Sequence, residues 1–327
     1  MPLTREVPHF VRRIVPACPL CIALLVAACT FSAAAQAPPQ GRSPAPATNS
    51  MIPDTAPERV SDHVYAIEAF PNIGFIVGQR AILVVDTGLG PRNGTTVANA
   101  AAKLAPGRTL YLTTTHFHPE HAAGDSGFPA ATILIRPWVQ QKELQDDRMA
   151  MIDRFRGMSA QNKDLLQNVN FRTPDILFDK EITIDLGGVT ARLFWLGPAH
   201  TAGDEMIDVA PDRTLLTGDI VMNKTLPNLP GPSANLNNWI SILSQLIPLQ
   251  PLHVVPDHGK LGDGSLIAQE YGLLSNLRSR ALALKQQGRS AEEAGQLLLT
   301  EFKSKYSDWP NLNGIPGLVT HIYSENP

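Results

Sequence analysis

Cysteine is scarce in this chain, and its three cysteines all lie before residue 30, at Cys18, Cys21 and Cys29. If the segment that carries them is removed on export, the remaining chain has no disulfide and no thiolate metal ligand. Blocks of Lys and Arg are also missing, and the formal net charge is −3. Nucleic-acid phosphates require a basic face, so these absences exclude a disulfide scaffold and argue against a nucleic-acid partner.

Long hydrophobic runs are missing as well. The apolar stretch at residues 14–29 is interrupted by Pro16 and Pro19 and is too short to span a membrane. Positively charged residues precede it, and the small residues 33–35 follow it. This order is typical of a secretory signal peptide, which we place at residues 1–35. We therefore expect an exported, periplasmic protein whose mature chain has no integral membrane span.

The end of the same stretch leaves a second mode of processing open. Residues 26–29, VAAC, resemble a lipoprotein processing box in which Cys29 would carry the lipid anchor. Residues 36–57 are rich in Pro, Ala, Ser and Thr and have no periodicity, which predicts a flexible leader. The chain is 43% hydrophobic, enough to bury a sizeable core, and we expect residues 58–327 to form the folded domain.

The densest group of metal-ligand side chains lies in residues 115–124, THFHPEHAAG. The apolar run 109–115 leads into it, so a strand ending there would leave these side chains on a loop at the edge of a sheet. Imidazole nitrogen and carboxylate oxygen are the ligands of zinc and similar metals. The group contains three imidazoles and one carboxylate: His116, His118, Glu120 and His121.

Periodicity predicts two sets of strands, each followed by helices, and hence packed sheets with helices outside. The expected strands are residues 60–69, 73–77, 81–85, 109–115, 132–135, 182–186, 189–196, 206–209, 214–217 and 253–255. The expected helices are residues 93–105, two within 137–168 broken near Gly157, 236–247, 266–287 and 291–306. Further metal-type side chains recur directly after strands: Asp86, His200, Asp219 and His258.

The motifs around these four residues occur in a specific order. They are LVVDTG at 83–88, GPAHTAGD at 197–204, LLTGD at 215–219 and VVPDHG at 254–259. Together with THFHPEHAAG, this series resembles the metallo-β-lactamase-fold hydrolase superfamily over residues 60–259. The resemblance implies an α/β protein with an αββα sandwich, the metallo-β-lactamase fold. Its metal site would lie at one edge of the two packed sheets.

The resemblance also implies two divalent metal ions, with zinc expected first and iron or manganese as alternatives. The ligands carried over are His116, His118 and His200 at the first metal, His121 and His258 at the second, and Asp219 between them. Asp86 would accept a hydrogen bond from a ligand histidine and so fix its tautomer.

Glu120 departs from the family pattern, which has aspartate at this position. One extra methylene moves a carboxylate by about 1.5 Å. Glu120 would either ligate the second metal from a shifted backbone or leave that metal weakly held and act as a base, so one metal is an alternative to two. We favour two because Asp219, His121 and His258 are all present, and we expect Glu120 and Asp219 to be the catalytic carboxylates.

The implied activity is an exported metal-dependent hydrolase. It would use a metal-bound hydroxide on an ester, lactone or amide bond of a small molecule, β-lactams included. The alternatives are an iron-dependent oxidoreductase of sulfur or oxygen chemistry on the same fold, and a non-catalytic metal-binding protein. Loops at 137–174 and 223–238 would shape the substrate site, where Asn223 and Lys224 are candidate ligands for a substrate carboxylate.

Overall fold

A computed structural model describes residues 51–325, which belong to one compact unit. The expected signal peptide, Cys29 and residues 36–50 of the expected leader lie outside the described residues. Ile52 lies in the described part of that leader, where it is buried and donates its backbone N–H to Asn93 Oδ1. The packed domain therefore includes residues before 58. None of the helices in residues 51–325 is long and apolar enough to cross a membrane.

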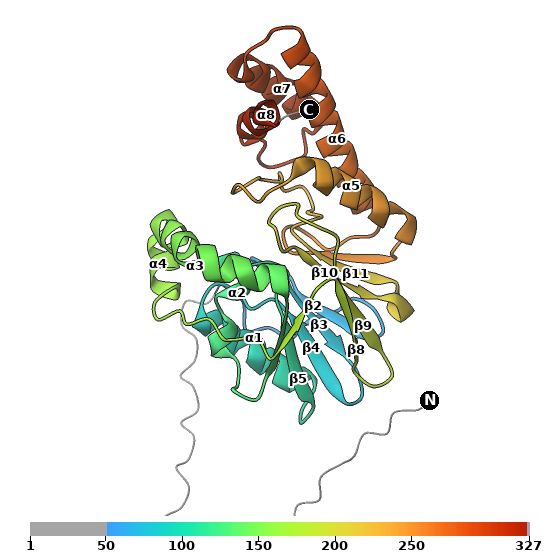
Figure 1. Cartoon of the computed structure of the whole chain (residues 1–327). Helices are drawn as coiled ribbons and strands as arrows, with labels where there is room; N and C mark the ends of the chain where they lie inside the picture. Colours follow the sequence, from blue (N-terminus) through green and yellow to red (C-terminus); the bar gives the residue numbers. More distant parts are fainter. Residues whose placement is uncertain (1–50, 326–327) are drawn as a thin grey trace, which may run out of the picture. The chain divides into compact units, whose positions relative to one another are not determined.

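Two β-sheets form the centre of the fold (Figure 1). The larger sheet has the order β1-β2-β3-β4-β5-β6-β7, antiparallel from β1 to β4 and parallel from β4 to β7. Its strands are β1 (Glu58–Arg59), β2 (Val64–Ile67), β3 (Ile73–Val77), β4 (Ala81–Val85), β5 (Thr109–Thr113), β6 (Ile133–Pro137) and β7 (Ile176–Phe178). The smaller sheet has the order β12-β11-β10-β9-β8, in which only β11 and β12 are parallel. Its strands are β8 (Glu181–Asp185), β9 (Thr190–Trp195), β10 (Glu205–Val209), β11 (Thr214–Gly218) and β12 (His253–Pro256).

Helices cover the outer face of each sheet. The helices are α1 (Pro91–Leu104), α2 (Pro119–Ala122), α3 (Trp138–Met158), α4 (Ala160–Leu165), α5 (Leu236–Leu246), α6 (Ser265–Gln286), α7 (Ala291–Lys305) and α8 (Ile315–Ser324). Short 3₁₀ turns lie at Asp125–Gly127, Ala210–Asp212 and Ile247–Leu249. The layer order is helix, sheet, sheet, helix, so the αββα sandwich expected from the sequence is confirmed.

Strand β4 shows how the sequence produces these layers. All five of its residues are buried, as in a strand covered on both faces. Because successive side chains of a strand point to opposite faces, Leu83 and Val85 join the core between the sheets, whereas Ile82 and Val84 join the core beneath α1. A third core lies under α5 and includes Trp239.

Helices α6, α7 and α8 follow the last strand (Figure 1). Their buried side chains belong to the same core as those of α5. Leu273, Phe302 and Val319, one from each helix, are fully buried there. Helix α7 begins with a capping box, in which Ser290 and Glu293 satisfy each other's backbone N–H groups. This C-terminal part is therefore continuous with the sandwich core rather than a detached extension.

Several boundaries differ from those expected. The break between α3 and α4 falls at Ser159, close to the expected position near Gly157, because the Ser159 side chain accepts from the Asn162 N–H and caps α4. Strand β5 ends at Thr113, two residues before the expected end at 115. Elements β1, β7 and α2 were not expected, since two to four residues are too few to show a periodic pattern.

Candidate metal centre

The side chains predicted as metal ligands lie together at one edge of the two sheets, where strands end. Asp86 follows β4, the histidine cluster follows β5, and Asp219 follows β11. His200 lies in the turn between β9 and β10, and His258 follows β12. None of the expected ligands is more than 8% exposed, so the group is almost shielded from solvent: His116, His118, Glu120, His121, His200, Asp219 and His258.

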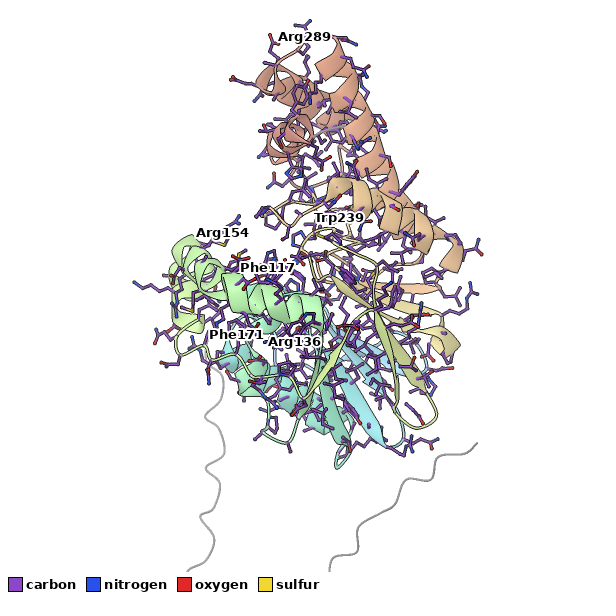
Figure 2. The ribbon with its side chains drawn as sticks, viewed as in Figure 1. Phe117, Arg136, Arg154, Phe171, Trp239 and Arg289 are labelled. Carbon is purple, nitrogen blue, oxygen red and sulfur yellow. The ribbon has the colours of Figure 1, made fainter. Side chains whose placement is uncertain are left out.

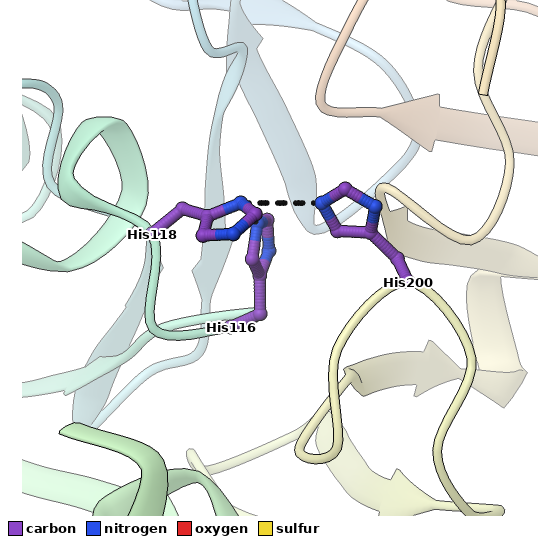
Figure 3. A group of neighbouring side chains, drawn as sticks. All are labelled: His116, His118 and His200. Carbon is purple, nitrogen blue, oxygen red and sulfur yellow. Dashed lines mark hydrogen bonds between the residues drawn. The ribbon is translucent and has the colours of Figure 1, made fainter. Parts of the chain in front are cut away.

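Three histidines form the first group, shown in Figure 3. His118 Nδ1 lies 2.9 Å from His116 Nε2 and 3.2 Å from His200 Nε2. Two imidazole lone pairs that face each other repel unless a proton or a cation lies between them. Tetrahedral zinc with Zn–N bonds of about 2.0–2.1 Å requires nitrogens roughly 3.3 Å apart, so this spacing suits one ion.

The tautomer of His200 is set by the backbone. Its Nδ1 lies 3.0 Å from the carbonyl oxygen of Asn228, so Nδ1–H donates and Nε2 remains free to bind a metal. The turn that carries His200 is closed by Asp204, whose carboxyl accepts from the Thr201 and Ala199 N–H groups. Burial raises the pKa of Asp204 to about 8.

Glu120, His121 and His258 form the second group. His121 Nδ1 lies 2.8 Å from Asp86 Oδ2 and 3.2 Å from Asp257 Oδ2, which leaves Nε2 directed toward the other ligands. Burial opposes a charge on His121, but the nearby carboxylates outweigh it and hold the pKa of His121 well above its ordinary value. The position therefore favours positive charge, which a bound cation would also supply.

Asp219 lies between the two groups. Its Oδ2 is 3.3 Å from His200 Nε2 and 3.9 Å from His116 Nε2. Its Oδ1 is 3.3 Å from His258 Nε2 and 4.0 Å from His121 Nε2. Burial pushes the pKa of Asp219 upward, but the surrounding imidazoles prevail and lower it. The carboxylate therefore stays ionised and presents one oxygen to each group.

Unpartnered atoms test whether these residues fit a metal. Among residues 51–325, His121 Nε2, Asp219 Oδ1 and Glu120 Oε2 are buried without a hydrogen-bond partner. Buried polar atoms of this kind require an explanation, and an ion is a standard one. Burial, together with the neighbouring imidazoles, holds the pKa of His116 and His118 well below their ordinary value, and burial also lowers that of His200. Neutral imidazoles are the form that binds metal, so these three histidines fit, whereas at His121 a metal would take the place of the proton.

A cavity of about 240 Å³, which we call the site cavity, lies over this cluster of histidines and carboxylates. Both loop regions expected to shape the substrate site contribute to its walls, with Met151 and Phe155 from α3 and Asn228 and Pro230 from the later loop. The lining residues are Met51, Phe70, Leu89, His118, Glu120, Met151, Arg154, Phe155, Met158, Asn162, His200, Asp219, Met222, Thr225, Asn228, Pro230 and His258.

Asn223 and Lys224 have other partners within the described chain. The Asn223 side chain donates to the Lys260 carbonyl oxygen at 2.9 Å, and Lys224 Nζ lies 2.5 Å from Asp308 Oδ2. Lys224 lines a different cavity, of about 420 Å³, against α8. Their role in binding a substrate carboxylate stays a prediction.

Two residues around His121 were not singled out from the sequence. Asp257 immediately precedes His258, and Thr115 immediately precedes His116. Thr115 Oγ1 lies 2.8 Å from Asp257 Oδ2 and 3.0 Å from Asp86 Oδ2, which links the two carboxylates that flank His121. The signal available in the sequence for Asp257 was its position directly before His258, a candidate ligand.

The sequence matches the family model of the metallo-beta-lactamase superfamily over residues 67–258, more than half of the chain. Similar solved structures include a metallo-beta-lactamase from Pontibacter korlensis, at 18% identity and a TM-score of 0.54, covering 67% of this chain and 98% of that one. The DIM-1 metallo-beta-lactamase exposed to ceftazidime matches at 17% identity and a TM-score of 0.53, covering 69% and 98%.

A larger enzyme also shares the fold. The stereoselective inverting sec-alkylsulfatase Pisa1 from Pseudomonas sp. matches at 15% identity and a TM-score of 0.60. The match covers 74% of this chain but only 45% of that one, so this chain spans less than half of that enzyme. At such identities the likeness shows the fold alone. No curated protein sequence matches this chain.

Proposed function

Because this chain belongs to the metallo-beta-lactamase superfamily, we propose that it is an exported metal-dependent hydrolase of a small molecule. The bond that it cleaves would be an ester, a lactone or an amide, and the amides include β-lactams. The observation that carries the proposal is the position of Asp219 between two groups of buried nitrogen and oxygen ligands. The proposed export rests on the sequence of residues 1–35.

We assign one metal to His116, His118 and His200. The second metal is assigned to Glu120, His121 and His258, with Asp219 shared between the two. The two oxygens of Asp219, each 3.3 Å from a histidine of a different group, support the sharing. Zinc is the metal proposed first, because the ligands are imidazoles and carboxylates and zinc accepts both.

When bound, the metal ions would lower the pKa of a coordinated water molecule, so that hydroxide is available at neutral pH. Side chains of the protein would orient the metal ligands and accept protons. Burial raises the pKa of the Glu120 carboxyl above its ordinary value, and Glu120 is the carboxylate proposed as the general base. Asp86 and Asp257 hold the His121 ring in place.

The test is a metal-quantified activity screen of the purified full-length protein. Esters, thioesters, lactones and β-lactams are assayed before and after chelation, with metal content measured in the same samples. His116→Ala should abolish hydrolysis and lower the metal content. His253→Ala is the matched control, since His253 lies in β12 and belongs to neither ligand group.

Two outcomes would contradict the proposal. Full iron occupancy after anaerobic purification, with no hydrolysis of any substrate, would favour the oxidoreductase alternative. If His116→Ala leaves both the metal content and the rate of hydrolysis unchanged, the site is wrongly assigned.

A further inference from the structure

Methionine is concentrated around the site cavity. The chain has seven methionines, and four of them line this one cavity: Met51, Met151, Met158 and Met222. They come from the segment before β1, from α3 and from the turn after β11. Methionine is unbranched and polarisable, so walls built from it adapt to apolar surfaces of different shape. Phe70, Leu89 and Phe155 extend the same apolar lining.

One lining residue has a different character. Arg154 is the only Lys or Arg in the lining of the site cavity as far as residues 51–325 show, and Figure 2 marks it on α3. It also lines a neighbouring cavity of about 220 Å³, together with Phe117 and Thr201. The two cavities therefore share Arg154 beside the ligand His118, which lines both.

The guanidinium of Arg154 is available for a ligand. Its side chain is exposed, and within residues 51–325 it has no hydrogen bond or ion pair. Two other cations of α3 are paired, Arg156 with Asp153 and Lys142 with Asp146. Arg148 has no such pair within residues 51–325 either, but it lines a separate cavity. Asp147, which lines the neighbouring cavity, does not lie within 4.0 Å of a cationic atom in the described chain.

Arg154 and the proposed metal ligand His118 line the same two cavities. An anion bound at Arg154 within the site cavity would therefore share that cavity with His118, His200 and Asp219. A substrate held there has its charged group in the same cavity as the proposed metal ligands.

We propose that the substrate is an amphipathic anion, whose apolar body lies on the methionine wall and whose carboxylate or sulfonate-type oxygens pair with Arg154. This inference rests on the proposed function and names its substrate class. A guanidinium offers two parallel N–H donors to such an oxyanion, which gives orientation as well as attraction. Lys224, the candidate that the sequence suggests for this role, pairs with Asp308 and lines the cavity against α8.

The test measures binding directly, without hydrolysis. Octane-1-sulfonate and octan-1-ol are titrated by calorimetry into the metal-loaded full-length protein, since a sulfonate is a weak metal ligand and neither probe has a hydrolysable bond. We expect Arg154→Ala to weaken octane-1-sulfonate binding about fivefold, as for an exposed ion pair, and to leave octan-1-ol binding unchanged. Arg154→Lys should retain part of the sulfonate affinity.

Arg148→Ala is the matched control. Arg148 is an exposed arginine of the same helix that lines a separate cavity with Ile152 and Phe171, so both affinities should stay at the wild-type value. The apolar part of the proposal is tested with butane-1-sulfonate. Four fewer methylene groups should weaken binding about tenfold or more, if the chain is even partly buried against the methionines.

The proposal is overturned if octane-1-sulfonate does not bind the wild type, or if Arg154→Ala leaves its affinity unchanged or weakens both probes equally. It is also overturned if Lys224→Ala weakens sulfonate binding and Arg154→Ala does not, or if chain length has no effect. These outcomes are separate from those of the activity screen. A protein that binds the sulfonate through Arg154 and hydrolyses nothing contradicts the proposed hydrolase but retains the anion site.

Discussion

Asp86 Oδ2 lies 2.8 Å from Nδ1 of His121, although the two residues follow different strands of the larger sheet. Both side chains are fully buried. Asp86 has a φ of 71°, in the left-handed region that aspartate adopts more readily than most residues, and its other oxygen accepts from the Thr115 N–H at 2.7 Å. The His121 ring is thereby held with Nε2 facing the second group of ligands.

Asp86→Asn tests this relationship. Groups that orient a ligand histidine typically contribute about 10–100-fold to metal affinity, and we expect a loss of that size. Competition with a chromophoric chelator measures it. Asp212→Asn is the matched control, because Asp212 makes a similar contact with His63, at 2.8 Å, outside the metal cluster. Unchanged metal affinity in a folded Asp86→Asn protein would contradict the assigned role.

Glu120→Gln separates the two roles considered for this residue. The substitution keeps the length of the side chain but removes its charge, so both a ligand and a general base are lost. We expect weaker binding of the second metal and a kcat lower by about 10²–10⁴, the usual contribution of a general base. Metal stoichiometry and steady-state kinetics give the two readouts.

Glu120→Asp is the companion variant, since it restores the carboxylate that the family usually has at this position. It should retain two metals and at least part of kcat. If Glu120→Gln retains two metals and the wild-type kcat, Glu120 is neither ligand nor base.

The metal-type side chains that cluster in the structure could be singled out from the sequence because they follow strands in short, recognisable motifs. The apolar run 83–85 leads directly into Asp86, and the run 215–216 is followed three residues later by Asp219. Their roles in binding a metal stay a prediction. Arg154 could not be found in this way. It lies within α3, a long helix with polar residues on most of its surface, and only the packing of that helix shows that it lines the site cavity. Met51 lay in the expected leader, where composition favoured flexibility.

Local strand and helix signals gave the layer order for a similar reason. A strand buried on both faces, such as β4, has a continuous apolar run that can be recognised without tertiary information. The turn geometry around His200 could not be obtained from sequence, because it depends on the Asn228 carbonyl, 28 residues away.

Gly94→Ala tests the packing of α1 against the segment that follows the histidine cluster. A Cβ at Gly94 would lie 1.8 Å from the carbonyl oxygen of Gly124, so one backbone would have to move. We expect a loss of about 2–3 kcal/mol in the free energy of unfolding, as for an overpacked core, measured by urea denaturation.

Gly272→Ala, in α6, is the control for that substitution. No other atom lies within 4 Å of its added Cβ, so a gain of about 0.5–1 kcal/mol is expected from helix propensity. If Gly94→Ala were as stable as the wild type, the close approach of α1 to Gly124 would be wrong.

Asp204→Asn tests the pH dependence of the turn that carries His200. Burial raises the pKa of Asp204 to about 8, above the value of about 3.9 in an unfolded chain. Its proton is therefore bound more tightly in the folded state, so its stabilising contribution is complete below about pH 4 and is lost as the pH rises toward 8.

The asparagine variant cannot titrate. Its stability relative to the wild type should therefore increase between pH 5 and pH 8, by at most about 1.4 kcal/mol per pH unit. Urea denaturation of both proteins at several pH values measures this difference. A difference that stays constant over the whole range would contradict the raised pKa of Asp204.

The most direct test of the metal-dependent hydrolase is a metal titration of the chelated protein. Zinc is added stepwise to the full-length chain while ester or lactone hydrolysis is followed. We expect chelation to abolish hydrolysis and added zinc to restore it, with a plateau at two equivalents per chain, one for each group of ligands around Asp219. Hydrolysis that is unaffected by complete removal of metal, or that never appears at any metal content, would contradict the assignment.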